Sequence, residues 1–141
     1  MKTIKNINIK KILWYNNINY NMTTTICNNT STLSLEQRLS EASKIKKKYP
    51  DKIPVIINKS SMCNNLDNID RNKYLIPHDL CVGQLSHIVK KRLNIDSTTA
   101  IFLFCNNNIL NSSNTINELH NLYKNADGFL YIEYTSENTF G

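Results

Sequence analysis

The amino-acid sequence predicts one small α+β domain, because two kinds of apolar pattern alternate along its 141 residues. In three segments, apolar residues recur every three or four positions, as they do on one face of an α-helix. Short runs of β-branched and aromatic residues lie between these segments, as expected of strands. A chain of this length normally builds one core, so we expect one domain.

Residues 1–33 show neither pattern. They hold eight Asn, four Lys and no acidic residue. Such a segment buries too little apolar surface to offset the entropy of ordering it, so we expect a disordered Asn/Lys-rich extension at 1–33 and the folded domain at 34–141. A true start at Met22 and a targeting role for the basic segment are the alternatives.

The first helix is predicted to begin after Ser34, whose side chain and that of Gln37 can form a capping box. Pro50 disfavours helical geometry in the preceding residue and should end this helix. Its apolar stripe consists of Leu35, Leu39, Ala42, Ile45 and Tyr49.

Two strands and a second helix are expected next. Residues 53–57 and 73–76 are short β-branched or aromatic runs, and Pro77 should end the second one, which we place near a sheet edge. Residues 82–93 carry the second helical stripe, with basic residues in the last turn where they suit the helix dipole.

The last third of the chain should supply two strands around a short helix. Residues 100–104 are continuously apolar, which favours a central strand buried on both faces. Thr115 and Glu118 form a second capping box, Gly128 should end that helix, and residues 129–134 form the last strand. The resulting order, strand, strand, helix, strand, short helix, strand, is that of the β-grasp fold with an additional N-terminal helix.

Composition leaves the partner open but predicts no cofactor. The net charge is +6 and the first two-thirds of the chain is basic, which allows a basic scaffold that binds peptides or nucleic acid, with Tyr49 and Tyr74 as stacking platforms. Apolar runs are too short to span a bilayer, and no secretory leader is recognisable, so the cytoplasm is the expected compartment.

The cysteines predict no metal site. Neither a C-x-x-C pair nor zinc-finger spacing to a histidine occurs among Cys27, Cys63, Cys81 and Cys105. A cysteine hydrolase using Cys81 with His78 or His87 is a further alternative, but no orienting group or oxyanion site accompanies them. We therefore expect no catalytic residue.

Several separate motifs occur in an order that resembles one known family. They are Lys44–Ile56 (KIKKKYPDKIPVI), Lys73–Pro77 (KYLIP), Val82–Gln84 (VGQ), Asp127–Ile132 (DGFLYI) and Glu137–Gly141 (ENTFG). Over residues 35–141 the chain resembles the autophagy-related protein eight family, which includes the GABARAP and light chain three proteins. The resemblance implies a ubiquitin-like modifier that is not itself an enzyme.

The resemblance also implies chemistry at the C-terminal glycine, Gly141, which would be joined to phosphatidylethanolamine. A residue without a side chain lets the carboxylate enter a narrow activating site and pass through enzyme thiols to an amide. The implied partners are ubiquitin-like activating (E1-type) and conjugating (E2-type) enzymes and a deconjugating cysteine protease. Attachment to a protein lysine instead of a lipid is the alternative.

A second implied activity is recognition of peptides with an aromatic residue and, three positions on, an aliphatic one. The strand at 73–76 can accept such a peptide as an added strand, with Lys73 and Leu75 on one side and Tyr74 and Ile76 on the other. By motif match, the aromatic pocket consists of Glu41, Ile45, Pro54, Lys73, Leu75 and Phe129. The aliphatic pocket consists of Tyr74, Ile76, Pro77, Leu80, Leu85, Ile88 and Val89, and Lys52 and Arg92 would contact acidic peptide residues.

Four positions depart from the family pattern. Leu85 replaces a usual phenylalanine, Ile88 a leucine, Asn72 a lysine and Lys52 an arginine, so we expect altered peptide selectivity. The implied location is cytoplasmic, with anchorage to autophagosomes after lipidation. The coding bias suggested by the Asn, Lys and Ile content adds a second hypothesis, the outer membrane of a plastid (apicoplast).

Overall fold

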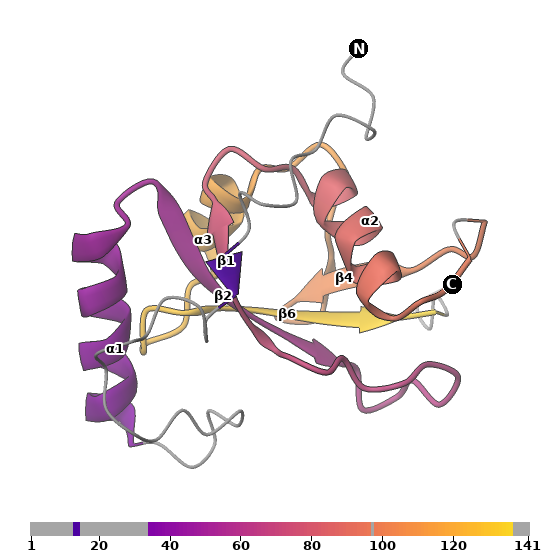
Figure 1. Cartoon of the computed structure of the whole chain (residues 1–141), viewed down its shortest axis with the longest axis horizontal. Helices are drawn as coiled ribbons and strands as arrows, with labels where there is room; N and C mark the ends of the chain where they lie inside the picture. The colour runs from indigo at the N-terminus through magenta and orange to yellow at the C-terminus, as the bar shows by residue number, and fades with distance from the viewer. Residues whose placement is uncertain (1–12, 15–33, 97, 137–141) are drawn as a thin grey trace.

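The computed structural model describes residues 13–14, 34–96 and 98–136, which form a mixed six-stranded sheet with helices on both faces (Figure 1). The strands lie in the order β1-β3-β2-β6-β4-β5, and the central pair β2 and β6 is parallel. The strands are β1 (Leu13–Trp14), β2 (Lys52–Lys59), β3 (Lys73–Pro77), β4 (Phe102–Cys105), β5 (Asn108–Ile109) and β6 (Leu130–Thr135), and the helices are α1 (Leu35–Lys48), α2 (Val82–Arg92) and α3 (Ile116–Tyr123). From α1 onward, this confirms the predicted β-grasp element order, with β5 as one additional short strand.

Both predicted capping boxes are present. The Gln37 amide donates to Ser34 Oγ at 3.2 Å, and the Ser34 amide donates to Gln37 Oε1 at 2.9 Å. At α3, the Glu118 amide donates to Thr115 Oγ1 at 3.2 Å. These bonds satisfy amides that have no partner inside the helix, so local sequence alone sets where α1 and α3 begin.

The sheet separates two apolar clusters of unequal size. A cluster of eighteen buried residues lies between the sheet and helices α2 and α3. On the other face, α1 packs over a cluster of five buried residues, and Figure 1 shows α1 well apart from the other two helices. The five are Ala42, Ile45, Ile56, Leu75 and Phe129.

Three details differ from the sequence-based expectation. Strand β4 is not central, because the two-residue strand β5 lies outside it and β2 and β6 hold the centre. The turn between β4 and β5 uses Asn106 and Asn107 at positive φ, and this Asn-Asn pair is the signal that would have predicted β5. Helix α3 ends at Tyr123, before Gly128.

Gly128 instead shapes the turn into β6. Its φ is +88°, and a Cβ added there would lie 3.0 Å from the Cβ of Ala42 on α1. Only glycine combines this backbone conformation with so close an approach of the helix.

The segment expected to be disordered contributes one strand. Leu13 and Trp14 pair antiparallel with β3, which disorder over the whole of 1–33 does not predict, and the rest of that segment lies outside the described residues. Within the described parts of the chain, no helix is long and apolar enough to cross a bilayer, and no group of three or more potential metal ligands is found.

Candidate functional site

Strand β3 joins the two predicted pockets, because its side chains alternate between the two faces of the sheet. Tyr74 and Ile76 belong to the larger cluster, beneath α2, whereas Leu75 belongs to the smaller one, beneath α1. Lys73 also turns toward α1, where its ammonium lies 3.3 Å from Glu41 Oε1. The predicted division of these four residues between two sides is confirmed.

The backbone of β3 alternates as well. The Ile57 amide donates to the Asn72 carbonyl at 2.8 Å, and Ile57 and Asn72 continue the β2–β3 register. In an antiparallel ladder every second pair is hydrogen-bonded, so the amides of Tyr74 and Ile76 face β2 and those of Lys73 and Leu75 face the outer edge. Pro77 has no amide hydrogen and ends that row of donors.

The six residues predicted for the aromatic pocket converge beneath α1. Ile45, Leu75 and Phe129 pack in one cluster, and Pro54 lies opposite Leu75 in the β2–β3 register. Glu41 and Lys73 complete the set with their ion pair. Burial raises the pKa of the Glu41 carboxyl above its ordinary value, and the Lys73 ammonium opposes that rise.

Asp127, which the sequence analysis did not assign to the aromatic pocket, makes contacts that hold the elements around this pocket together. Its carboxylate is buried, accepts from the Phe129 amide at 2.9 Å and from the Tyr131 hydroxyl, and lies 3.5 Å from Arg38 Nη1 of α1. These contacts tie α1 to the start of β6. The Asp127-Gly128 pair within the family motif was the available signal.

The residues predicted for the aliphatic pocket gather beneath α2. All of them except the half-buried Pro77 are buried members of the larger cluster: Tyr74, Ile76, Leu80, Leu85, Ile88 and Val89. The Tyr74 hydroxyl donates to the Arg71 carbonyl at 2.5 Å, and burial raises the pKa of that hydroxyl. This side of the site is therefore continuous with the main core of the domain.

Arg92 and Lys52, the two predicted contacts for acidic peptide residues, differ in how closely an acidic residue of this chain already pairs with them. Arg92 Nη2 lies 2.7 Å from Asp70 Oδ2, whereas Lys52 Nζ is 3.9 Å from the exposed carboxylate of Asp51. An incoming carboxylate must compete with Asp70 at Arg92 and meets a looser partner at Lys52.

Among the described residues, those predicted to line the two pockets are mostly buried. Lys73 is only 4% exposed and Leu75 is fully buried, although a docking groove was expected here. The outer edge of β3 is paired with β1, in the register Leu13 to Leu75 and Trp14 to Tyr74.

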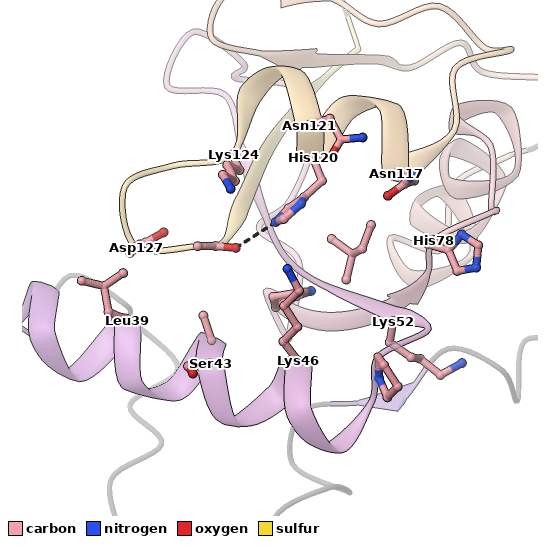
Figure 2. A pocket seen from close by; sticks show the side chains of 15 residues that line it. Leu39, Ser43, Lys46, Lys52, His78, Asn117, His120, Asn121, Lys124 and Asp127 are labelled. Atoms are coloured by element: carbon pink, nitrogen blue, oxygen red, sulfur yellow. Dashed lines mark hydrogen bonds between the residues drawn. The ribbon is translucent and has the colours of Figure 1, made fainter.

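A separate cavity of about 520 Å³ lies between α1, the start of β2 and α3. Figure 2 shows Lys46 reaching from α1 toward His120 of α3, whose Nε2 is 3.0 Å from the Gly128 carbonyl oxygen. Of the predicted site residues, only Lys52 and Pro54 line this cavity. We place the candidate site at β3, because the two pockets there share one strand edge that an extended peptide can pair with.

The structure gives no support to the cysteine hydrolase that was considered from the sequence. In the described part of the chain, no hydrogen bond joins Cys81 to His78 or His87, and the Cys81 amide instead donates to Gln84 Oε1 at the start of α2. The described cysteines Cys63, Cys81 and Cys105 are free thiols. Gly141, the predicted conjugation residue, lies outside the described residues.

The family model and the curated relatives that match this chain all belong to one family. Residues 37–141 match the family model described as "Autophagy protein Atg8 ubiquitin like". Autophagy-related protein 8a of Arabidopsis thaliana is 44% identical over 107 residues, covering 76% of this chain and 87% of the relative. Autophagy-related protein 8h from the same plant is 43% identical over 108 residues, covering 77% and 90%.

A solved structure is similar in fold and sequence. The crystal structure of Trypanosoma brucei ATG8 superposes with a TM-score of 0.72 at 36% sequence identity, and the match covers 79% of this chain and 96% of that one. The similarity thus extends over nearly the whole length of the solved chain.

Proposed function

Since this chain belongs to the Atg8 family of ubiquitin-like autophagy proteins, we propose that it is a modifier conjugated through Gly141 to phosphatidylethanolamine. On the membrane, the β3 edge recruits proteins that carry aromatic-x-x-aliphatic motifs. The recruiting role is supported by the side chains of β3, since Leu75 lies beneath α1 and Tyr74 and Ile76 lie beneath α2. One extended peptide along that edge reaches both apolar clusters.

The chain is a substrate of the conjugation chemistry and does not catalyse it. An activating enzyme joins the Gly141 carboxylate to AMP and releases pyrophosphate from ATP; an enzyme thiol then displaces AMP to give a thioester. The phosphatidylethanolamine amine attacks the thioester, which forms an amide and frees the thiol. A cysteine protease reverses the step by hydrolysis.

The named relatives are autophagy proteins, which favours autophagosomal membranes over a plastid membrane as the site of anchorage. Before conjugation the chain would be cytoplasmic, and the lipid would supply its membrane attachment.

A lipidation assay tests the conjugation. The purified chain, its activating and conjugating enzymes, ATP and liposomes containing phosphatidylethanolamine are incubated and the product is read by intact mass. We expect an adduct of lipid mass that requires ATP and is lost in the Gly141→Ala variant. An unmodified mass with enzymes that lipidate another family member would leave a non-conjugated basic scaffold as the better account, and salt-dependent RNA binding would then be measured.

A further inference from the structure

The outer edge of β3 is the surface that the proposed function needs, and part of this chain already lies along it. Strand β1 pairs Leu13 with Leu75 and Trp14 with Tyr74. Because the Leu75 amide faces outward, the Leu13–Leu75 pair is the hydrogen-bonded one. The internal strand therefore takes the same backbone donor that an added peptide strand would use.

We propose that the segment containing Leu13 and Trp14 is an internal ligand of the β3 edge, which a motif peptide must displace before it can dock. The inference rests on the proposed function, since it concerns the occupancy of the same edge. It agrees with the low exposure of Lys73 and Leu75, which are 4% and 0% exposed on the strand that β1 pairs with.

The sequence around β1 has the chemistry of such a ligand. Strand β1 runs antiparallel to β3, so its residues meet β3 in reverse order. In the sequence, residues 12–15 read Ile-Leu-Trp-Tyr, an apolar run that combines the aliphatic and aromatic residue types that the pockets are proposed to accept.

Charge makes the internal ligand displaceable. Residues 1–33 contain four Lys and no acidic residue, and the predicted contacts beside the pockets, Lys52 and Arg92, are also basic. A peptide with acidic flanks is attracted to these basic contacts, whereas the charged side chains of the internal segment are all basic. Added salt should therefore weaken the acidic peptide and not the internal strand.

The tether compensates for the weak pairing. Nineteen residues, 15–33, join β1 to residue 34, and a short linker gives an effective concentration of about 1 mM. A two-residue strand with a dissociation constant of roughly 0.1 mM would then occupy the edge about nine-tenths of the time, and an external peptide would bind roughly 10-fold more weakly.

Amide hydrogen exchange tests the pairing without any peptide. The variant Leu13→Pro removes the backbone donor at the paired residue, and Thr24→Pro puts the same change elsewhere in the segment. We expect the Leu75 amide of the Leu13→Pro chain to exchange roughly 10-fold faster than in the unsubstituted chain, with Thr24→Pro unchanged. The Ile76 amide faces β2 and is the internal reference, so it should exchange equally in all three chains.

The proposal is overturned if Leu75 exchanges at the same rate in all three chains. It is also overturned if protection of Leu75 disappears on dilution, since the strand would then come from a second copy. Should Leu13→Pro also release Ile76, the chain starting at Met22 replaces it in the same comparison, and equal protection of Leu75 with and without residues 1–21 overturns the proposal.

A peptide titration separates this inference from the proposed function. An acidic-flanked aromatic-x-x-aliphatic peptide should bind Leu13→Pro roughly 10-fold more tightly than the unsubstituted chain, while Thr24→Pro matches the latter. Equal affinities together with faster Leu75 exchange would show that the segment does not compete, which refutes the internal-ligand role. If the peptide binds no variant, the recruiting function fails, and the exchange data still decide whether β1 pairs in cis.

Discussion

The two faces of β3 present pockets of different physical kinds. Beneath α2, Tyr74 and Ile76 join a cluster of eighteen residues that is the main core of the domain. Beneath α1, Leu75 belongs to a cluster of only five residues, beside the Glu41–Lys73 ion pair. A ligand side chain that enters beneath α2 must displace residues of the main core. One that enters beneath α1 needs to move only that helix away from a small cluster. Stability and recognition should therefore be more separable on the α1 face.

Truncation of matched isoleucines makes this contrast measurable and should give the largest effect. Ile76→Ala removes a fully buried side chain from the main core and should lower the free energy of unfolding by about 3–5 kcal/mol. Ile45→Ala lies under α1, which can settle into the space, so about 2–3 kcal/mol is expected. Chemical denaturation of both variants provides the comparison. Equal losses, or a larger loss at Ile45, would show that the two faces form one equally rigid core.

The ion pair beneath α1 should give a smaller, pH-dependent effect. Burial holds the pKa of Glu41 above its ordinary value of 4.5, so above that pH the folded state binds more protons than the unfolded state and stability falls as pH rises. Lys73→Met removes the cation that limits this rise. We expect it to cost about 1–3 kcal/mol at high pH and much less below pH 4.5, where the raised pKa keeps Glu41 protonated.

Its control is Glu41→Gln, which keeps the shape and removes the carboxylate. That variant should lose the part of the pH dependence that belongs to Glu41, as read from denaturation midpoints between pH 4 and 8. A Lys73→Met chain whose loss of stability is the same at every pH would refute the electrostatic account and leave packing as the cause.

Sequence reasoning succeeded where the signal is local. The capping boxes at Ser34 and Thr115 need only residues three positions apart, and the alternation along β3 follows from the geometry of any strand. The family motifs then indicated which residues lie together, and the structure brings Ile45, Leu75 and Phe129 into one cluster.

What the sequence could not supply depends on contacts between distant segments. Strand β1 is two residues long, too short for any periodicity, and exists because the β3 edge is there to pair with. The buried carboxylate of Asp127 matters because Arg38, far away in the chain, approaches it from α1. Apolar content at 100–104 predicted a central strand buried on both faces, but of these residues only Leu103 and Phe104 are buried and Ala100 is exposed. The position of a strand within a sheet is set by the topology of all the strands.

Beneath α2, a single buried hydroxyl gives the next test. Tyr74→Phe keeps the ring in the main core but removes the bond to the Arg71 carbonyl, so about 1 kcal/mol should be lost. The loss should fall mainly on the loop before β3 and on Arg92, which also interacts with the Tyr74 hydroxyl, seen as faster amide exchange around Arg71 with little change in the rest of α2. Uniform acceleration across α2 would mean that this bond supports the whole larger cluster.

The smallest expected effect concerns charge at the rim of the two pockets. Arg92 is held by Asp70 at 2.7 Å, and both side chains are partly exposed, so the pair contributes little to stability and is screened by salt. Asp70→Asn removes the competing carboxylate and should strengthen binding of an acidic-flanked peptide about 2- to 5-fold at low salt, with the free energy of unfolding changed by less than about 1 kcal/mol. Asp51→Asn is the matched control, because Asp51 lies 3.9 Å from Lys52 and competes weakly. A larger gain from Asp51→Asn than from Asp70→Asn would place the acidic contact at Lys52, and calorimetric titration at two salt concentrations distinguishes the two results.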